Sequence, residues 1–492
     1  MNPFLHFKPY VLSFILLLSS LFLLVSCDKD PIEEEEEKVE FAVDIGDSQI
    51  PYVVISTEGV ILNEPKIPAT MKIYEQKVEK QELNIGIEYR GSTSFRISDK
   101  KSFGIETWDA AGNDIDVSIF GLPEEEDWIL NGHVVNIGGQ FIFDRTMLYN
   151  HFGYTLARGI GRYASNTRMI ELEINGEYLG VYVFMEKLKR DKNRIDISKL
   201  NPDENEGEDL TGGYILKIDK TTGGDLGITQ PLEYFENNWP DDSRYTQDIS
   251  FRSQYDILGN VIDFPAYDEP FYDDAFLFLE TYFLYEYPDA DEISSQQKSY
   301  IQEYIHSFET ALLQDDFNTS TRTYTDYIDL ESFVDYFLLN EVCRNVDAYR
   351  LSTYLFKDKN KKLNMGPIWD LNIGFDTGDR VPWDGWVINY NNYVERDPWM
   401  VHFWWPRLME DSIFRQAVKD RWNALRSGAM STSSMHAIID DAVSLLQRNG
   451  AVERNYIKWD IGVPIDYMAS IESLKNYLSQ RTAWMDSEIA KF

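Results

Sequence analysis

The stretch 340–376, NEVCRNVDAYRLSTYLFKDKNKKLNMGPIWDLNIGFD, carries the pattern that decides the fold. The stretch begins at the end of segment 330–342. This segment has apolar residues at helical spacing, which predicts an amphipathic helix. Two short apolar segments follow, 351–356 and 363–369, and both predict strands. The polar residues 358–361 between them predict a turn, so the order is helix, loop, hairpin, loop.

Each loop of this stretch carries an aspartate, Asp347 in the first and Asp370 in the second. The two residues are 23 positions apart in the chain (370 − 347). A hairpin brings its two ends together, so the residues before its first strand and after its second strand become neighbours. We therefore expect both carboxylates at the mouth of one site, although a single loop aspartate is more often a cap or a turn residue.

Two carboxylates at one site suit phosphoryl transfer, because one can accept the proton of an attacking hydroxyl while the other binds Mg²⁺. Asp370 and Asn372 are two residues apart, so in an extended segment both can offer oxygen ligands on the same side. Paired carboxylates also serve glycoside hydrolysis. That alternative requires one carboxyl with a raised pKa, and the sequence shows no apolar niche that would raise it.

The rest of the chain divides into a strand-rich part and a helical part. Between residues 39 and about 128, apolar residues alternate with polar ones, which predicts an antiparallel sheet. Asn175-Gly176 between segments 169–174 and 178–185 predicts a hairpin with a type I′ turn. Segment 213–219 predicts a further strand.

Helical spacing first appears in segment 144–160, where Asp144 is the expected N-cap, and it dominates after residue 268. An α+β fold with a β-rich N-terminal half and a helical C-terminal half follows from this order. The further helices are predicted over 295–313, 330–342, 411–426, 433–447 and 466–490.

Several short motifs occur along the chain in a fixed order. They are Arg90-Gly91-Ser92-Thr93-Ser94, Lys100-Lys101-Ser102-Phe103, Asp144-Arg145, Glu173-Ile174-Asn175-Gly176 through Gly180 and Tyr182 to Glu186-Lys187, Asn345-x-Asp347, Trp369-Asp370-Leu371-Asn372 and a late helix with Arg481. Their joint order, rather than any one of them, resembles that of the CotH kinase family, an atypical family with a protein-kinase-like fold, and the resemblance spans roughly residues 50 to 492.

This resemblance implies a two-lobed, kinase-like fold and a kinase that uses ATP and Mg²⁺. The γ-phosphoryl group of ATP would pass to a hydroxyl group, with Ser or Thr of a protein as the acceptor. The expected domains are a signal peptide at 1–26, an acidic tether at 27–40, a β segment at 41–80, an N-lobe with an insertion at 81–265 and a helical C-lobe at 266–492.

Carried over by position, the resemblance implies that Asp347 is the catalytic base and that Asn345 orients its loop or assists the metal. Asp370 and Asn372 would be the metal ligands. Many relatives have Asp at the position of Asn372 and Asn at the position of Ser352. An Asn in place of Asp keeps an oxygen ligand but removes a charge, so we expect weaker metal binding here.

Three further residues are candidates for the nucleotide site. The resemblance implies phosphate contacts for Arg90 and Lys101, and an ion pair between Lys101 and Glu186. The alternative is a solvated Lys101 at a strand end and a surface pair between Glu186 and its neighbour Lys187.

The N-terminus has the features of an export signal. Lys8 precedes the apolar run 11–26, which is too short for a confident membrane span. The run ends at Leu24-Val25-Ser26-Cys27, which resembles the lipidation motif of bacterial lipoproteins, and the acidic stretch after it resembles surface-export signals of Bacteroidota lipoproteins. We therefore expect a lipid anchor at Cys27 and a place on the outer membrane, exposed at the cell surface. The alternative is an uncleaved membrane anchor with an incidental cysteine.

Composition excludes several other functions. The 83 acidic residues outnumber the 46 basic ones, for a net charge of −37, so nucleic acid is not an expected partner. Two cysteines exclude a disulfide scaffold and a Cys-cluster metal site, and Cys343 is expected to be a buried apolar residue.

The 30 Tyr and 12 Trp also suit a second hypothesis, a catalytically inactive surface lipoprotein that binds glycan or protein. The cluster of Trp399, Phe403, Trp404 and Trp405 is expected in the core.

Overall fold

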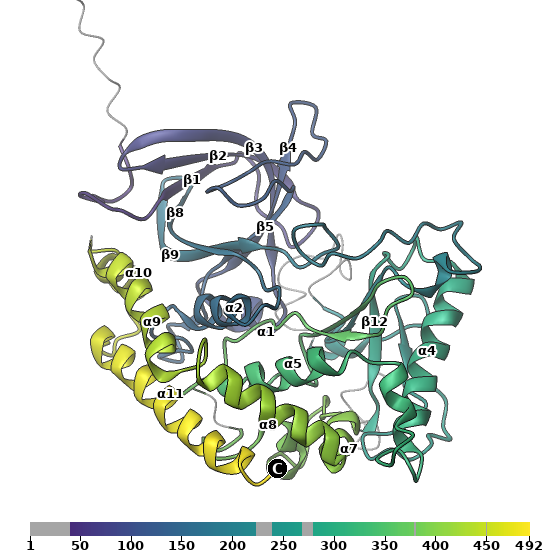
Figure 1. The fold of residues 1–492 in the computed structure, drawn as a ribbon. Coiled ribbons are helices and arrows are strands. Elements are labelled where there is room, and N and C mark those ends of the chain that lie inside the picture. The colour runs from purple at the N-terminus through teal and green to yellow at the C-terminus, as the bar shows by residue number, and fades with distance from the viewer. Residues whose placement is uncertain (1–39, 223–238, 268–278, 378–379, 449) are drawn as a thin grey trace, which may run out of the picture. The chain divides into compact units, whose positions relative to one another are not determined.

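Seven strands close into a barrel in the order β1-β2-β3-β4-β5-β9-β8 (Figure 1). The strands β1 and β8 pair in parallel, and every other neighbouring pair is antiparallel. Apolar side chains such as Val53, Met71, Trp128 and Phe184 fill the interior. The bounds are β1 (Tyr52–Ser56), β2 (Ile67–Glu75), β3 (Val78–Arg90), β4 (Ser102–Trp108), β5 (Asp127–Asn131), β8 (Thr167–Ile174) and β9 (Glu177–Glu186).

The computed structural model describes residues 40–222, 239–267, 279–377, 380–448 and 450–492. Phe41–Phe492 form one compact unit. The expected signal peptide, the lipidation site Cys27 and all of the tether except Glu40 lie outside the described residues.

The predicted hairpin around Asn175-Gly176 is confirmed. Strands β8 and β9 pair with Ile174 opposite Glu177, and both turn residues have positive φ, as a type I′ turn requires. The hairpin also closes the barrel between β1 and β5, which the alternation of residues 39–128 did not predict.

A second, five-stranded antiparallel sheet has the order β11-β12-β10-β13-β14. Strand β10 (Tyr214–Ile218), predicted from the sequence, lies at its centre. The predicted hairpin of β13 (Thr353–Lys357) and β14 (Asn364–Met365) is confirmed, but β14 is shorter than segment 363–369 because Pro367 has no amide to continue the pairing. The other bounds are β11 (Ser250–Arg252) and β12 (Tyr282–Tyr287), and β6 (Val135–Asn136) pairs separately with β7 (Phe141–Ile142).

The helices lie mostly in the C-terminal half, so the predicted α+β class is confirmed, while the division into kinase-like lobes stays a prediction (Figure 1). Helices α4, α5, α8, α9 and α11 agree with the prediction to within one residue. The bounds are α1 (Thr93–Ile97), α2 (Tyr149–Gly159), α4 (Ser295–Leu313), α5 (Leu330–Cys343), α6 (Tyr390–Tyr393), α7 (Trp404–Glu410), α8 (Ser412–Arg426), α9 (Thr432–Gln447), α10 (Ala451–Lys458) and α11 (Tyr467–Ile489). No helix of the described ranges is long and apolar enough to cross a membrane.

Helix α2 begins five residues later than predicted. The carboxylate of Asp144 accepts a hydrogen bond from the backbone N–H of Tyr149 at 2.8 Å, so it satisfies the first helical amide from outside the helix. The prediction of Asp144 as the N-cap was therefore wrong: the N-cap position is Leu148, and Asp144, four residues before it, accepts from the first helical amide.

The core of the helical part contains the aromatic cluster that the sequence placed there. Trp399, Phe403, Trp404 and Trp405 are all buried, and Cys343 is buried on α5, as expected. Burial raises the pKa of the Cys343 thiol, so this cysteine behaves as an apolar residue.

Candidate functional site

The loop after α5 carries Asp347, and Asn345 holds this loop to the segment before Asp370. The side-chain amide of Asn345 donates to Asn340 Oδ1 at 3.2 Å and to the carbonyl oxygen of Trp369 at 3.3 Å. Its oxygen accepts from the backbone N–H of Asp347 at 3.3 Å. One buried amide therefore fixes both aspartate loops relative to each other.

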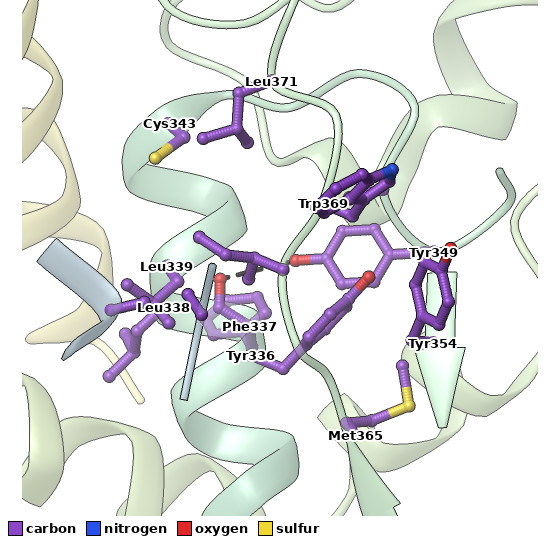
Figure 2. Close-up of a cluster of buried hydrophobic side chains, with 14 of the residues drawn as sticks. Tyr336, Phe337, Leu338, Leu339, Cys343, Tyr349, Tyr354, Met365, Trp369 and Leu371 are labelled. Atoms are coloured by element: carbon purple, nitrogen blue, oxygen red, sulfur yellow. Dashed lines mark hydrogen bonds between the residues drawn. The ribbon is translucent and has the colours of Figure 1, made fainter. Parts of the chain in front are cut away.

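Asp370 is directed away from the core by its two neighbours. Trp369 and Leu371 are both buried in the cluster of apolar side chains that Figure 2 shows, in which Leu371 lies beside Cys343. The Trp369 ring packs edge-to-face against Tyr354, with centroids 6.4 Å apart. Asp370 itself has φ of +51°, a conformation that costs free energy in a residue with a side chain and that recurs at functional sites.

Helix α2 clamps the Asp370 loop with two side chains. The backbone N–H of Asp370 donates to the Tyr154 hydroxyl at 3.2 Å, and that of Leu371 donates to Asn150 Oδ1 at 2.9 Å. The Asn150 amide nitrogen donates to Asn372 Oδ1 at 3.4 Å, and the Asn372 amide nitrogen donates to Asp370 Oδ1. These contacts compensate the strained backbone at Asp370.

Both aspartates face one cavity of about 200 Å³, which we call the carboxylate cavity. Of the residues predicted from the sequence, Asp347, Asp370, Asn372 and Arg90 line it. The structure therefore brings the two loops together as the hairpin argument expected. Its wall also contains Gly91, Ser92, Thr93, Ser94, Ser102, Asn131, Asn150, Tyr154, Lys217, Asp219, Lys220, Ser352, Trp369 and Arg380.

Asp219 is a third carboxylate at the carboxylate cavity, and it was not predicted from the sequence. It follows β10 directly, and β10 pairs with β13 so that Ile218 lies opposite Thr353, close to the Asp347 loop. Its Oδ1 accepts from the backbone N–H of Lys220 at 2.9 Å. The available signal was a strand that ends in an aspartate, the same pattern as at Asp370, but nothing in the sequence showed that β10 is the neighbour of β13.

The surroundings raise the pKa of Asp370 to about 7. Burial is the largest cause, followed by the negative charges of Asp347 and Asp219, while Arg90 opposes the shift. The expectation that no carboxyl here has a raised pKa was wrong, because residues distant in sequence build the niche. Carboxylates that repel one another in this way gain stability from a proton or from a cation.

Two arginines hold Asp347. The guanidinium of Arg350, which is fully buried, contacts Asp347 Oδ1 at 2.5 Å and Asp397 Oδ1 at 3.1 Å, and it stacks over the Tyr390 ring. Arg380 lies farther out, with Nη1 3.7 Å from Asp347 Oδ1 and 3.8 Å from Asp397 Oδ2. Asp347 therefore has a fixed orientation at the wall of the carboxylate cavity.

Three further cations border the cavity. The Arg90 guanidinium, at the end of β3, lies 5.9 Å from the ring centroid of Trp369. Lys217 on β10 pairs with Glu286 at 3.0 Å, and Lys220 pairs with Asp242 at 2.9 Å. The two lysines were not predicted, since they lie on β10 and just after it, and the sequence gave no reason to place that strand here.

Lys101 and Glu186 do not line the carboxylate cavity. The Lys101 ammonium donates to the carbonyl oxygen of Phe95 at 2.6 Å. Glu186 is buried and accepts from the Tyr163 hydroxyl at 3.1 Å and from the backbone N–H of Asn166 at 2.8 Å. The structure thus does not gather these two residues with the two aspartates.

A second acidic group lies on the barrel, where ligand atoms of Glu125, Glu126 and Asp127 come within 4.8 Å of one another. The Lys189 ammonium contacts all three carboxylates, at 2.7, 2.5 and 2.9 Å. Arg194 also contacts Glu125 at 3.1 Å and Lys187 contacts Asp127 at 3.6 Å, so side-chain cations already pair with this group.

The fold and the cavity define an α+β protein whose site combines three carboxylates with several cations, which suits a phosphorylated ligand. The chain belongs to the CotH kinase protein family, whose model matches residues 87–485. That match includes each residue placed at the carboxylate cavity. Comparison with curated proteins gives no match.

Proposed function

We propose that this protein is a kinase that transfers the γ-phosphoryl group of ATP to a hydroxyl group, with a Ser or Thr of a protein as the acceptor. One observation carries the proposal: Asp347 and Asp370 share one cavity with Arg90, as a phosphoryl-transfer site requires. Membership of the CotH kinase family supports the same reaction class. The alternative of an inactive binding module is not favoured by either observation.

The residues at the carboxylate cavity suit Mg²⁺. This hard cation prefers carboxylate oxygens, and here Asp219, Asp347 and Asp370 raise the free energy of the site by mutual repulsion. Asp370 would hold the ion, with Asp219 as the second candidate. When bound, Mg²⁺ neutralises the charge of the nucleotide phosphates.

Asp347 is proposed to accept the proton of the acceptor hydroxyl, because Arg350 keeps its carboxylate at the wall of the cavity. Asn345 acts as a positioning residue that joins the two aspartate loops. Arg90 and the hydroxyls of Ser92, Thr93 and Ser94, which follow β3, are the proposed phosphate contacts. Lys101 and Glu186 have no part in this proposal, since their contacts lie elsewhere.

A calorimetric titration of ATP with and without Mg²⁺ tests the proposal. Wild-type protein should bind the nucleotide only with Mg²⁺, and Asp370→Ala should lose this binding. Asp347→Ala should keep binding and lose transfer of labelled phosphate to a protein acceptor by about 10²–10⁴-fold. Asp441→Asn, at an exposed position of α9, is the matched control. Absence of any Mg²⁺-dependent nucleotide binding in the wild type would refute the proposal.

We also propose that the protein is a lipoprotein anchored through Cys27 on the outer membrane and exposed at the cell surface. The apolar run before Cys27 and the acidic segment after it support this localisation. Mass spectrometry of the N-terminal peptide and protease treatment of intact cells test it. An unmodified Cys27, or complete protection of the protein from the protease, would contradict it.

A further inference from the structure

A chain of side-chain amides with fixed polarity runs from α2 to Asp370. The backbone N–H of Leu371 donates to Asn150 at 2.9 Å. A backbone N–H can only donate, so the oxygen of the Asn150 amide faces it and the nitrogen is left for Asn372. That nitrogen donates to Asn372 Oδ1 at 3.4 Å.

The contact with Asn150 also fixes the orientation of the Asn372 amide. Its oxygen is directed to Asn150, so its nitrogen is the atom that faces Asp370, and it donates to Asp370 Oδ1. An amide nitrogen is not a ligand for a hard cation. The orientation thus disagrees with the expectation that Asn372 and Asp370 offer oxygens to one metal ion.

We propose that Asn372 is a positioning residue that donates a hydrogen bond to Asp370, rather than a second metal ligand. This inference rests on the proposed function, because it concerns the carboxylate proposed to hold Mg²⁺. The amide N–H of Asn372 donates directly to Asp370. A carboxylate at position 372 would instead repel Asp370 unless a cation lay between them.

The arrangement has a physical reason. Asp370 shares the carboxylate cavity with Asp347 and Asp219 and has a strained backbone, so the donor at Asn372 holds its side chain in place without a metal. Removal of that donor leaves the backbone of the loop in place, because Tyr154 and Asn150 hold the amides of Asp370 and Leu371. Cation affinity should therefore depend on Asp370 and not on the amide of Asn372.

Titration of the full chain with Mn²⁺, followed by the electron paramagnetic resonance signal of the free ion, tests the inference. Asn372→Ala should bind Mn²⁺ as tightly as the wild type or more tightly, because a competing donor is lost. A loss of affinity of about tenfold or more would overturn the inference, since that is the effect of removing a ligand. Asp370→Asn should abolish binding; if it binds as the wild type does, the metal site of the proposed function fails instead.

If the metal site fails in this titration, the thermal stability of the metal-free protein still tests the role of Asn372. In EDTA, Asn372→Ala and Asn372→Asp should both lower Tm, by about 2 °C or more, because each removes a donor beside a charged acceptor. Asn476→Ala is the matched control, since Asn476 also donates to a carboxylate, that of Glu472, but on the exposed face of α11. Tm values equal to that of the control would overturn the inference, whatever the Mn²⁺ titration gives.

Discussion

Glu341 on α5 and Arg481 on α11, 140 residues apart, form a fully buried ion pair with 2.9 Å between Oε2 and Nη2. Arg481 also donates to the carbonyl oxygens of Glu341 and Gly385, and Glu341 accepts from the backbone N–H of Val387 at 2.8 Å. Helix α5 leads into the Asp347 loop. The ion pair therefore anchors the helix that carries this loop to α11.

Arg481→Met should lower the free energy of unfolding by about 3–5 kcal/mol, because it leaves the Glu341 carboxylate buried without its partner. Urea denaturation followed by circular dichroism measures the change. Lys491→Ala removes the exposed pair with Glu488 and should change the free energy by about 1 kcal/mol or less. Equal effects of the two substitutions would show that the buried pair does not hold α5.

Gly153→Ala in α2 should destabilise the protein by about 1–3 kcal/mol, although alanine favours a helix. A Cβ at this position would lie 2.0 Å from Leu371 Cδ1, so the side chain behind Asp370 must move. Loss of Mg²⁺-dependent nucleotide binding should accompany the lower Tm. Gly159→Ala is the control in the same helix, where the nearest atom would be 3.9 Å away. It should keep nucleotide binding and leave Tm unchanged or slightly higher, because alanine favours the helix.

The raised pKa of Asp370 predicts a pH dependence of stability. In the unfolded chain the carboxyl ionises near pH 4, whereas in the folded protein its pKa is about 7. Between these values the folded state binds a proton that the unfolded state has released, so the free energy of unfolding falls as pH rises, by up to about 1.4 kcal/mol per pH unit.

Urea unfolding at pH values from about 4 to 8 measures this dependence as the difference between the wild type and Asp370→Asn. The difference should decline with rising pH in the absence of divalent cations and should decline less when Mg²⁺ is present. A difference that is constant across this range would mean that Asp370 has an ordinary pKa in the folded protein.

Asp219→Asn should return the pKa of Asp370 towards its ordinary value, because the charge of Asp219 is one cause of the shift. We expect binding of ATP with Mg²⁺ to weaken by about 10-fold or more, if Asp219 supports the cation as proposed. Calorimetric titration of the folded variant beside Asp441→Asn gives the result. Unchanged affinity would remove Asp219 from the proposed site.

Much of the site was predictable because the hairpin argument is local. A turn between two apolar segments places Asp347 and Asp370 together whatever the rest of the fold does, and both line one cavity. The amphipathic helices were predictable for the same reason. Asp144 shows the limit at element ends, because a carboxylate can cap a helix from several residues away.

The missed features depend on contacts between distant segments. Asp219 reaches the site because β10 pairs with β13, and a single sequence does not reveal which strands are neighbours. The raised pKa of Asp370 has in part the same origin, since burial is its largest cause and the charge of the distant Asp219 adds to that of Asp347. The candidates Lys101 and Glu186 were chosen by motif order alone, and the structure gives each of them other contacts.

The barrel has a practical consequence for the expression of the matched region alone. The family match starts at residue 87, near the end of β3, yet β1 and β2 come earlier and β1 joins β2 to β8. A truncated product that starts there lacks β1, β2 and most of β3. It therefore exposes the apolar lining of the barrel and leaves β4 and β8 with unpaired edges, which favours aggregation. A fragment that starts at Phe41 retains all seven strands of the barrel. The smallest soluble fragment should therefore be longer than the matched region.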